Sequence, residues 1–136
     1  MNTISPKIKI LVVEDNEDFR RLLTLVLEAK GYSVQVADNA EKAKEMISHQ
    51  SPDFDLVISD IKMPGGDGLS LLKFTRDANE NSKFILMSGM KIDFKEPQDL
   101  QPDDFLMKPF RSADLLKMVD RVCHKELYRE LEGTAS

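Results

Sequence analysis

The sequence has few of the residues that build disulfide frameworks, soft-metal sites or membrane spans. It contains no tryptophan, one cysteine (Cys123) and two histidines, His49 and His124, which lie far apart in the chain. A single cysteine excludes an internal disulfide and is typical of a reducing compartment, and two distant histidines argue against a soft-metal site. Apolar runs such as Ile10–Val13 are much shorter than the roughly 20 residues of a membrane span, and no secretory signal is recognisable. We therefore expect a cytoplasmic protein without membrane insertion.

The composition is that of an ordinary globular domain. Of 136 residues, 41% are hydrophobic and 32% are charged, and this length suits a single domain. The chain has 19 Lys and Arg residues against 24 Asp and Glu residues, a net charge of −5, without a dense basic block. Such a chain is poorly suited to hold nucleic acid through its bulk charge. No helix-turn-helix pattern is present either, so we expect no direct DNA binding.

Short apolar runs alternate with amphipathic segments along the chain. Strands are predicted for five runs: Ile8–Val13, Ser33–Ala37, Leu56–Ile58, Phe84–Met87 and Asp104–Met107. Helices are predicted after the first, second, third and fifth strands, and they begin near Asp15 or Asn16, Asp38–Asn39, Asp67 and Ser112. Parallel neighbours need a crossover, and each helix supplies one. The alternation therefore indicates a doubly wound α/β sandwich around a parallel sheet.

Four details of this prediction concern single segments. The first helix is expected to turn an apolar face inward, made of Phe19, Leu22, Leu23, Val26 and Leu27, and residues 61–67 are expected to form a loop. Residues 90–103 contain Pro97 and Pro102. Each proline would destabilise a helix interior by roughly 3 kcal/mol, so the fourth helix is expected to be reduced or irregular. The last helix is expected to continue through Leu131.

Polar residues that carry chemistry follow four of the five predicted strands. They are Glu14 and Asp15 after the first strand, Asp60 after the third, Ser88 after the fourth and Lys108 after the fifth. Ligands of doubly wound sheets bind outside these strand ends. Three carboxylates at one edge repel one another, and Mg²⁺ is a counter-charge that prefers oxygen ligands. Lys108 adds an ammonium that suits a phosphate, and Ser88 adds a hydroxyl donor. Together these groups are the parts that phosphoryl transfer needs.

Four motifs at these positions resemble the receiver domain of two-component response regulators. They are Ile10–Asp15, Ser59–Gly68, Met87–Gly89 and Lys108–Phe110. The resemblance implies a flavodoxin-like, five-stranded parallel sheet with strand order 2-1-3-4-5. It also implies a division of the chain into an N-terminal extension (1–7), the receiver domain (8–125) and an extended last helix with a tail (126–136). We expect the stand-alone, single-domain type of receiver.

The resemblance assigns the chemical site residue by residue. Asp60 matches the phosphoacceptor. Glu14 and Asp15, together with Asp60 and the backbone carbonyl of Lys62, match the group that holds Mg²⁺. Lys108 matches the lysine that pairs with the phosphoryl group.

The resemblance also implies a switch beside the chemical site. Ser88 matches the hydroxyl that turns toward the phosphoryl group, and Phe105 takes the place of an aromatic residue that changes rotamer on activation. Gly89 falls where a small residue leaves the acceptor open to an incoming phosphohistidine. The Lys108–Pro109 bond is expected to be cis.

These assignments lead to one hypothesis and two alternatives. The hypothesis is a signalling module that takes a phosphoryl group from a sensor histidine kinase or a histidine phosphotransfer protein and then binds a downstream effector. It is a monomer or weak dimer, and not an enzyme beyond its own phosphorylation and dephosphorylation. A metal-dependent phosphatase of haloacid-dehalogenase type also uses an Asp nucleophile, but it expects a second acid where this chain has Lys62. The other alternative is a receiver-like module that binds partners without phosphorylation.

Overall fold

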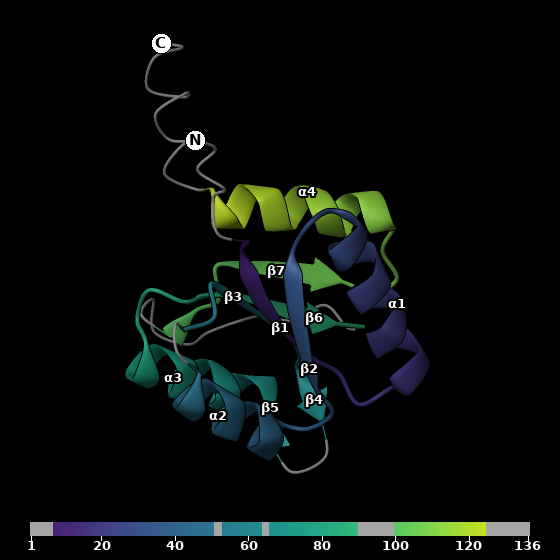
Figure 1. The fold of residues 1–136 in the computed structure, drawn as a ribbon. Helices are drawn as coiled ribbons and strands as arrows, with labels where there is room; N and C mark the ends of the chain where they lie inside the picture. The colour runs from purple at the N-terminus through teal and green to yellow at the C-terminus, as the bar shows by residue number, and fades with distance from the viewer. Residues whose placement is uncertain (1–6, 51–52, 64–65, 90–99, 125–136) are drawn as a thin grey trace, which may run out of the picture.

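A five-stranded parallel sheet forms the centre of the molecule (Figure 1). The computed structural model describes residues 7–50, 53–63, 66–89 and 100–124. The sheet order is β2-β1-β3-β6-β7, and the strands are β1 (Lys9–Val13), β2 (Ser33–Ala37), β3 (Leu56–Asp60), β6 (Lys83–Ser88) and β7 (Asp104–Met107). Since β6 and β7 are the fourth and fifth long strands of the chain, the predicted order 2-1-3-4-5 is confirmed.

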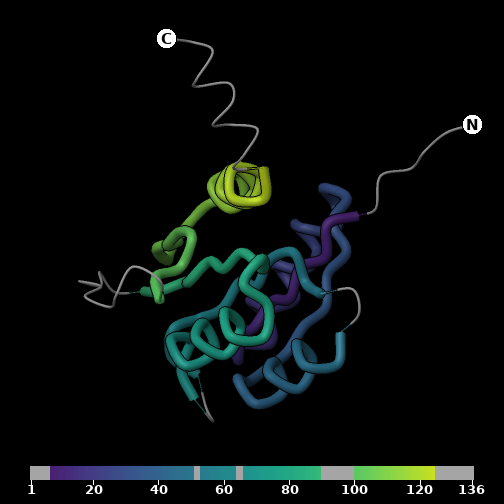
Figure 2. Tube along the Cα trace, turned by 90° about the vertical axis from the view of Figure 1, so that its left-hand side faces the viewer, coloured from purple at the N-terminus to yellow at the C-terminus, as the bar shows by residue number. Residues whose placement is uncertain are grey.

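Two pairs of helices cover the two faces of this sheet (Figures 1 and 2). One face carries α1 (Glu17–Ala29) and α4 (Ser112–Cys123), and the other carries α2 (Ala40–His49) and α3 (Gly68–Ala78). Successive residues of β1 point to opposite faces, so Ile10 and Val12 join one core while Leu11 and Val13 join the other. All four are completely buried. Burial on both faces explains why the run Ile10–Val13 is apolar throughout.

Polar caps begin the first three helices, as the sequence predicts. The side chain of Asn16 accepts from the backbone N–H of Phe19 at 2.9 Å, and Asn39 and Asp67 do the same for α2 and α3. Gly31, at φ +100°, ends α1 in a conformation that favours glycine. Since Asn16 is the cap of α1, Asp15 remains available for other contacts.

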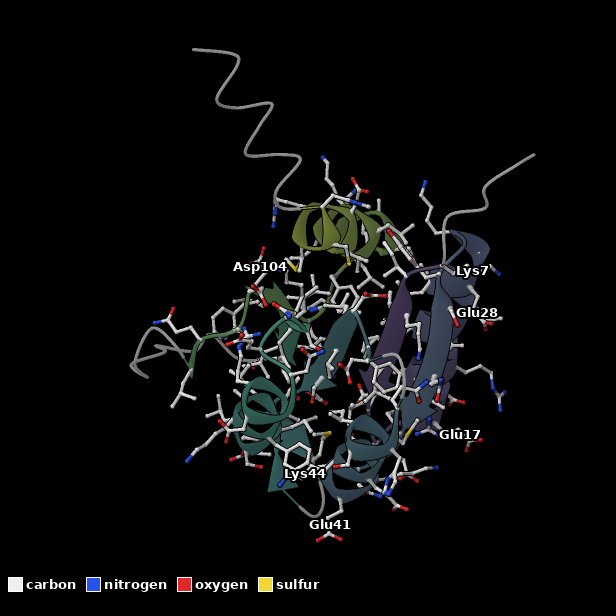
Figure 3. The ribbon with its side chains drawn as sticks, turned by 60° about the vertical axis from the view of Figure 1, so that its left-hand side comes forward. Lys7, Glu17, Glu28, Glu41, Lys44 and Asp104 are labelled. Carbon is white, nitrogen blue, oxygen red and sulfur yellow. The ribbon has the colours of Figure 1, made fainter. Side chains whose placement is uncertain are left out.

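Charged side chains lie on the outer faces of the helices. Glu17 and Glu28 of α1 and Glu41 of α2 are exposed and point away from the sheet (Figure 3). No helix in the described part of the chain is both long and apolar enough to cross a membrane.

Two expectations about individual segments are wrong. Leu22 does not join the core: its exposed fraction is 54%, because it lies about 100° around the helix from the buried Leu23. Residues 61–67 are not simply a loop, because β4 (Lys62–Met63) pairs antiparallel with β5 (Gly66–Asp67). The expected irregular segment falls largely on residues 90–99, which lie outside the described residues. In the structure α4 ends at Cys123, and the expected continuation to Leu131 also lies outside them.

Candidate functional site

The five residues singled out by their strand ends gather at one edge of the sheet, which we call the carboxyl edge. Glu14 and Asp15 directly follow β1, Asp60 and Ser88 are the last residues of β3 and β6, and Lys108 directly follows β7. The strands are in register here: Val13 pairs with Ser59, Asp60 with Met87, and Ser88 with Met107. The strand ends therefore bring residues from distant parts of the sequence to the same level of the sheet.

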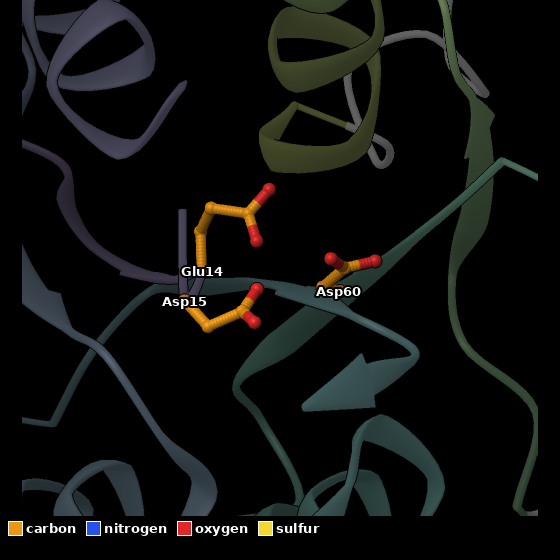
Figure 4. Close-up of side chains that lie close together, drawn as sticks. All are labelled: Glu14, Asp15 and Asp60. Atoms are coloured by element: carbon orange, nitrogen blue, oxygen red, sulfur yellow. The ribbon is translucent and has the colours of Figure 1, made fainter. Parts of the chain in front are cut away.

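Three carboxylates converge at the carboxyl edge (Figure 4). One oxygen from each of Glu14, Asp15 and Asp60 lies within 4.8 Å of the others. Their burial differs, since the Glu14 side chain is only 1% exposed, Asp60 is half-buried and Asp15 is exposed. Such a group of oxygen ligands, open to solvent on one side, has the composition that hard divalent cations prefer.

Lys108 supplies the positive charge of the cluster. Its Nζ donates to Glu14 Oε1 at 2.9 Å and to Asp60 Oδ2 at 3.0 Å. Its backbone N–H donates to the carbonyl of Ser88 at 2.7 Å, which continues the pairing of β7 with β6. The Lys108–Pro109 peptide bond is cis, as expected. The ammonium therefore bridges the ends of β1 and β3 from a position fixed by β6.

One ammonium does not balance three carboxylates, and the imbalance affects the pKa of Glu14. Burial is the main cause that raises the pKa of Glu14 from 4.5 to about 7, and the carboxyls of Asp60 and Asp15 add to it, while the hydrogen bond from Lys108 opposes it. Burial lowers the pKa of Lys108, but its hydrogen bonds to Glu14 and Asp60 outweigh this, so the pKa rises. Among the described residues, Glu14 Oε2 is the one buried side-chain oxygen or nitrogen without a hydrogen-bond partner.

Backbone contacts hold the carboxylates in place. The N–H of Ile61 donates to Asp60 Oδ1 at 3.1 Å, and Arg20 Nη1 donates to the carbonyl of Glu14 at 2.9 Å. Gly68, the first residue of α3, lies so close to β3 that a Cβ atom there would be 2.5 Å from the carbonyl oxygen of Asp60. A side chain at Gly68 would therefore displace the backbone that carries Asp60.

A cavity of about 320 Å³ opens beside Asp60. It is lined by residues from three strand ends and the start of α3: Asp60, Ile61, Lys62, Asp67, Leu69, Ser88 and Gly89. The structure thus brings Ser88 and Lys62 to the side of the cluster where Asp60 lies. Phe105, the remaining predicted switch residue, lies on β7 opposite Leu86, is 37% exposed and is not part of this lining.

Phe19, Arg20 and Gly68 contact the cluster although the sequence did not mark them as site residues. The ring centroid of Phe19 lies 4.7 Å from Lys108 Nζ. Phe19 was expected only as part of the apolar face of the first helix, and Gly68 only as the last residue of the Ser59–Gly68 motif. One feature of the sequence could have indicated that Phe19 and Arg20 contact the site. Both lie in the first turn of a helix that begins next to Glu14 and Asp15.

A doubly wound parallel sheet with an acidic cluster, a hydroxyl and an ammonium at its carboxyl edge defines a class of phosphoacceptor signalling domains. The chain belongs to the family described as the response regulator receiver domain, whose model matches residues 10–120.

Individual relatives agree with this assignment. Over 131 residues, 93% of the chain, it is 34% identical to the 3',5'-cyclic-nucleotide phosphodiesterase regA of Dictyostelium discoideum, but it spans only 16% of that protein. It is 33% identical over 116 residues to the response regulator receiver protein CpdR of Brucella abortus. This match covers 84% of this chain and 95% of CpdR. The crystal structure of the receiver domain from the hybrid histidine kinase CckA superposes with a TM-score of 0.73 at 31% identity, covering 85% of this chain and 99% of that domain.

The chain is thus a receiver domain of two-component systems, with a phosphoacceptor signalling role. Receiver domains interact with histidine kinases and effectors. The family assignment does not favour the phosphatase or the phosphorylation-independent module that the sequence left open.

Proposed function

We propose that this receiver accepts a phosphoryl group on Asp60 from the phosphohistidine of a sensor histidine kinase or a histidine phosphotransfer protein. The observation that carries the proposal is the position of Asp60, whose Oδ2 lies 3.0 Å from Lys108 Nζ while its side chain lines the open cavity. A donor can reach the carboxylate from the cavity, and an ammonium is already in place for the anionic group that it brings.

The acidic cluster fits Mg²⁺. Glu14, Asp15, Asp60 and the backbone carbonyl of Lys62 would hold the ion, which supplies positive charge to the crowded carboxylates and to the phosphoryl oxygens. The fit is supported by Glu14 Oε2, which is buried without a partner within the described part of the chain. A buried carboxylate oxygen in this state is unfavourable, and a cation in the cluster would remove the penalty.

The chemical step is a transfer between two nucleophiles. A carboxylate oxygen of Asp60 forms a bond to phosphorus while the bond from phosphorus to the donor imidazole nitrogen breaks, and the imidazole leaves with that electron pair. The product is an acyl phosphate on Asp60. Lys108 exchanges its contact with Asp60 Oδ2 for a phosphoryl oxygen, so its charge stays beside the developing negative charge.

The switch lies on β6 and β7. Ser88 lines the same cavity as Asp60, which supports a role for its hydroxyl as a donor to a phosphoryl oxygen. Ser88 pairs with Met107, and its carbonyl accepts from the Lys108 N–H, so a shift of Ser88 reaches β7 directly. We assign Phe105, two residues before Met107, as the residue that changes rotamer in response. The protein then acts as a cytoplasmic monomer or weak dimer whose altered surface binds a downstream effector protein, without binding DNA itself.

The decisive experiment is incubation with Mg²⁺ and acetyl phosphate followed by intact-mass measurement. We expect one phosphoryl adduct in the wild-type protein and none in Asp60→Asn. Asp67→Asn is the matched control, because Asp67 lines the same cavity and its role as helix cap is conserved by Asn. It should retain the adduct. Absence of the adduct in wild type, or its persistence in Asp60→Asn, would contradict the proposal. Steady turnover of a phosphomonoester without an adduct would favour the phosphatase.

A further inference from the structure

The ammonium of Lys108 is surrounded on three sides. Besides Glu14 Oε1 at 2.9 Å and Asp60 Oδ2 at 3.0 Å, the ring of Phe19 lies against it, with 4.7 Å between Nζ and the ring centroid. An aromatic face attracts a cation at this distance, and the attraction grows when the cation is partly removed from water. The Lys108 side chain is only 25% exposed, so the condition is met.

Two contacts hold Phe19 in place. The backbone N–H of Phe19 donates to the side chain of the cap residue Asn16 at 2.9 Å, which fixes Phe19 in the first turn of α1. Its ring packs on Phe110 with the centroids 5.7 Å apart and the planes tilted by 43°, within the range of favourable aromatic pairs. Phe110 lies two residues after Lys108, so the same ring connects the start of α1 to the segment that carries the ammonium.

From this arrangement we infer that Phe19 is a positioning residue for phosphoryl transfer, an inference that rests on the proposed role of Asp60. A lysine has a flexible four-carbon stem, and its ammonium can follow any nearby carboxylate or enter solvent. During transfer Lys108 has to exchange Asp60 Oδ2 for a phosphoryl oxygen. The aromatic ring stays in place during this exchange, and unlike Glu14, the other partner that stays, it is not among the residues that would hold Mg²⁺. It therefore keeps the ammonium within reach of Asp60 while one of its anionic partners changes.

The alternative is that Phe19 only fills space between α1 and the segment after β7. The two roles differ in what the ring must offer. Space filling needs an apolar volume, whereas positioning of an ammonium needs a negative aromatic face. Leucine conserves much of the apolar volume without the face. Tyrosine conserves both, and pentafluorophenylalanine conserves the shape while reversing the charge distribution of the face.

The test is the rate of adduct formation with acetyl phosphate at saturating Mg²⁺. We expect Phe19→Leu to lower the rate constant by about tenfold, as a partly desolvated cation–π contact predicts. Pentafluorophenylalanine at position 19 should lower it similarly, and Phe19→Tyr should leave it within about twofold of wild type. In a Lys108→Met background, Phe19→Leu should have no further effect, because the cation is gone. An equal effect of Phe19→Leu in both backgrounds, or a wild-type rate with pentafluorophenylalanine, would overturn the positioning role.

Nuclear magnetic resonance gives a second measurement that needs no phosphorylation. Protons of the Lys108 ε-methylene group should be shifted upfield by the ring current of Phe19, and the shift should vanish in Phe19→Leu. An unshifted ε-methylene group in wild type would overturn the inference. Failure of the proposed function is distinguishable: if wild type forms no adduct, the role of Asp60 and this role fall together. If the adduct forms at the same rate in wild type and Phe19→Leu, only the role of Phe19 falls.

Discussion

At the amino edge of the sheet, where the strands begin, buried polar atoms are paired, whereas at the carboxyl edge three carboxylates crowd around one ammonium. Ser82 Oγ donates to the carbonyl of Phe54 at 2.6 Å and accepts from Asn79 at 2.9 Å. Asp103 Oδ2 accepts from the N–H of Phe84 at 2.8 Å and from Arg76 at 3.1 Å. The carboxyl edge instead contains the buried, unpartnered oxygen of Glu14 among the described residues.

This difference distinguishes buried polar groups that stabilise the fold from the groups that we propose bind a cation and a phosphoryl group. A buried polar group with its partners contributes to stability, and one without them opposes it. The carboxyl edge is unfavourable in the protein alone, and on the proposed function a bound cation would balance both its carboxylates and the oxygens of an incoming phosphoryl group. Substitutions at the two edges should therefore change stability in opposite directions, and only one edge should affect phosphorylation.

The largest change in stability is expected at the amino edge, from Asp103→Ala. This variant leaves the Phe84 N–H without its acceptor and Arg76 without its ionic partner, and both are largely buried. We expect a loss of about 3 to 5 kcal/mol in the free energy of unfolding, measured by urea denaturation. The neighbouring Asp104 pairs with Arg121 nearer the surface, so Asp104→Ala should lose less than about 1 kcal/mol. If Asp103→Ala lowers the free energy of unfolding no more than Asp104→Ala does, the paired polar groups of the amino edge do not stabilise the fold as we infer.

At the carboxyl edge, Glu14→Gln should act in the opposite direction. Because the pKa of Glu14 is raised from 4.5 to about 7, the folded protein binds this proton more tightly than the unfolded chain. The stability that the proton contributes is complete below about pH 4.5 and is lost as the pH rises through about 7. Without divalent cations, wild type should therefore lose on the order of 3 kcal/mol between these limits.

The measurement is a series of urea denaturations from pH 4.5 to 8 in the presence of a chelator. Glu14→Gln should lack most of the loss seen in wild type and be the more stable protein at pH 8. Glu17→Gln is the control, since Glu17 is exposed on α1 and its variant should follow the wild-type curve. Identical curves for wild type and Glu14→Gln would show that the carboxyl edge is not under electrostatic strain. Adding Mg²⁺ should reduce the difference.

The smallest effects come from one buried serine at each edge. Ser82→Ala removes a hydroxyl bonded on both sides, and we expect a loss of about 1 to 2 kcal/mol of stability with an unchanged rate of phosphorylation. Ser88→Ala should still form the adduct on Asp60, but the chemical-shift change of Phe105 on phosphorylation should be reduced. Urea denaturation and nuclear magnetic resonance measure the two results. A Ser82→Ala variant that changed the phosphorylation rate would contradict the separation of the edges.

Much of the site was predictable because each member belongs to its own short pattern. Asp60, Ser88 and Lys108 each end or follow an apolar run, and parallel strands bring such ends to one edge whatever their distance in sequence. The caps at Asn39 and Asp67 were equally local, since a polar residue before an amphipathic segment is enough to begin a helix.

The remaining features depend on contacts between distant elements. Glu14 and Asp15 are neighbours in the sequence, yet one is buried and the other exposed, and two acids after a strand carry no signal for which of them is buried. Phe19 fits an apolar helix face whether or not an ammonium lies against it. Leu22 follows the same helical spacing as its buried neighbours but lies beyond the width of the covered stripe. The pairing of β4 with β5 involves only two residues on each side, too few for a pattern.

The contact between Lys108 and Glu14 joins residues 94 positions apart, and the contact with Asp60 spans 48. Synthesis proceeds from the N-terminus, so all three carboxylates emerge from the ribosome well before the lysine that balances them. An unfinished chain therefore carries the three carboxylates without their ammonium. On the proposed role of Asp60, we expect the chain to become competent for phosphorylation only after β7 has docked and brought Lys108 to the carboxyl edge.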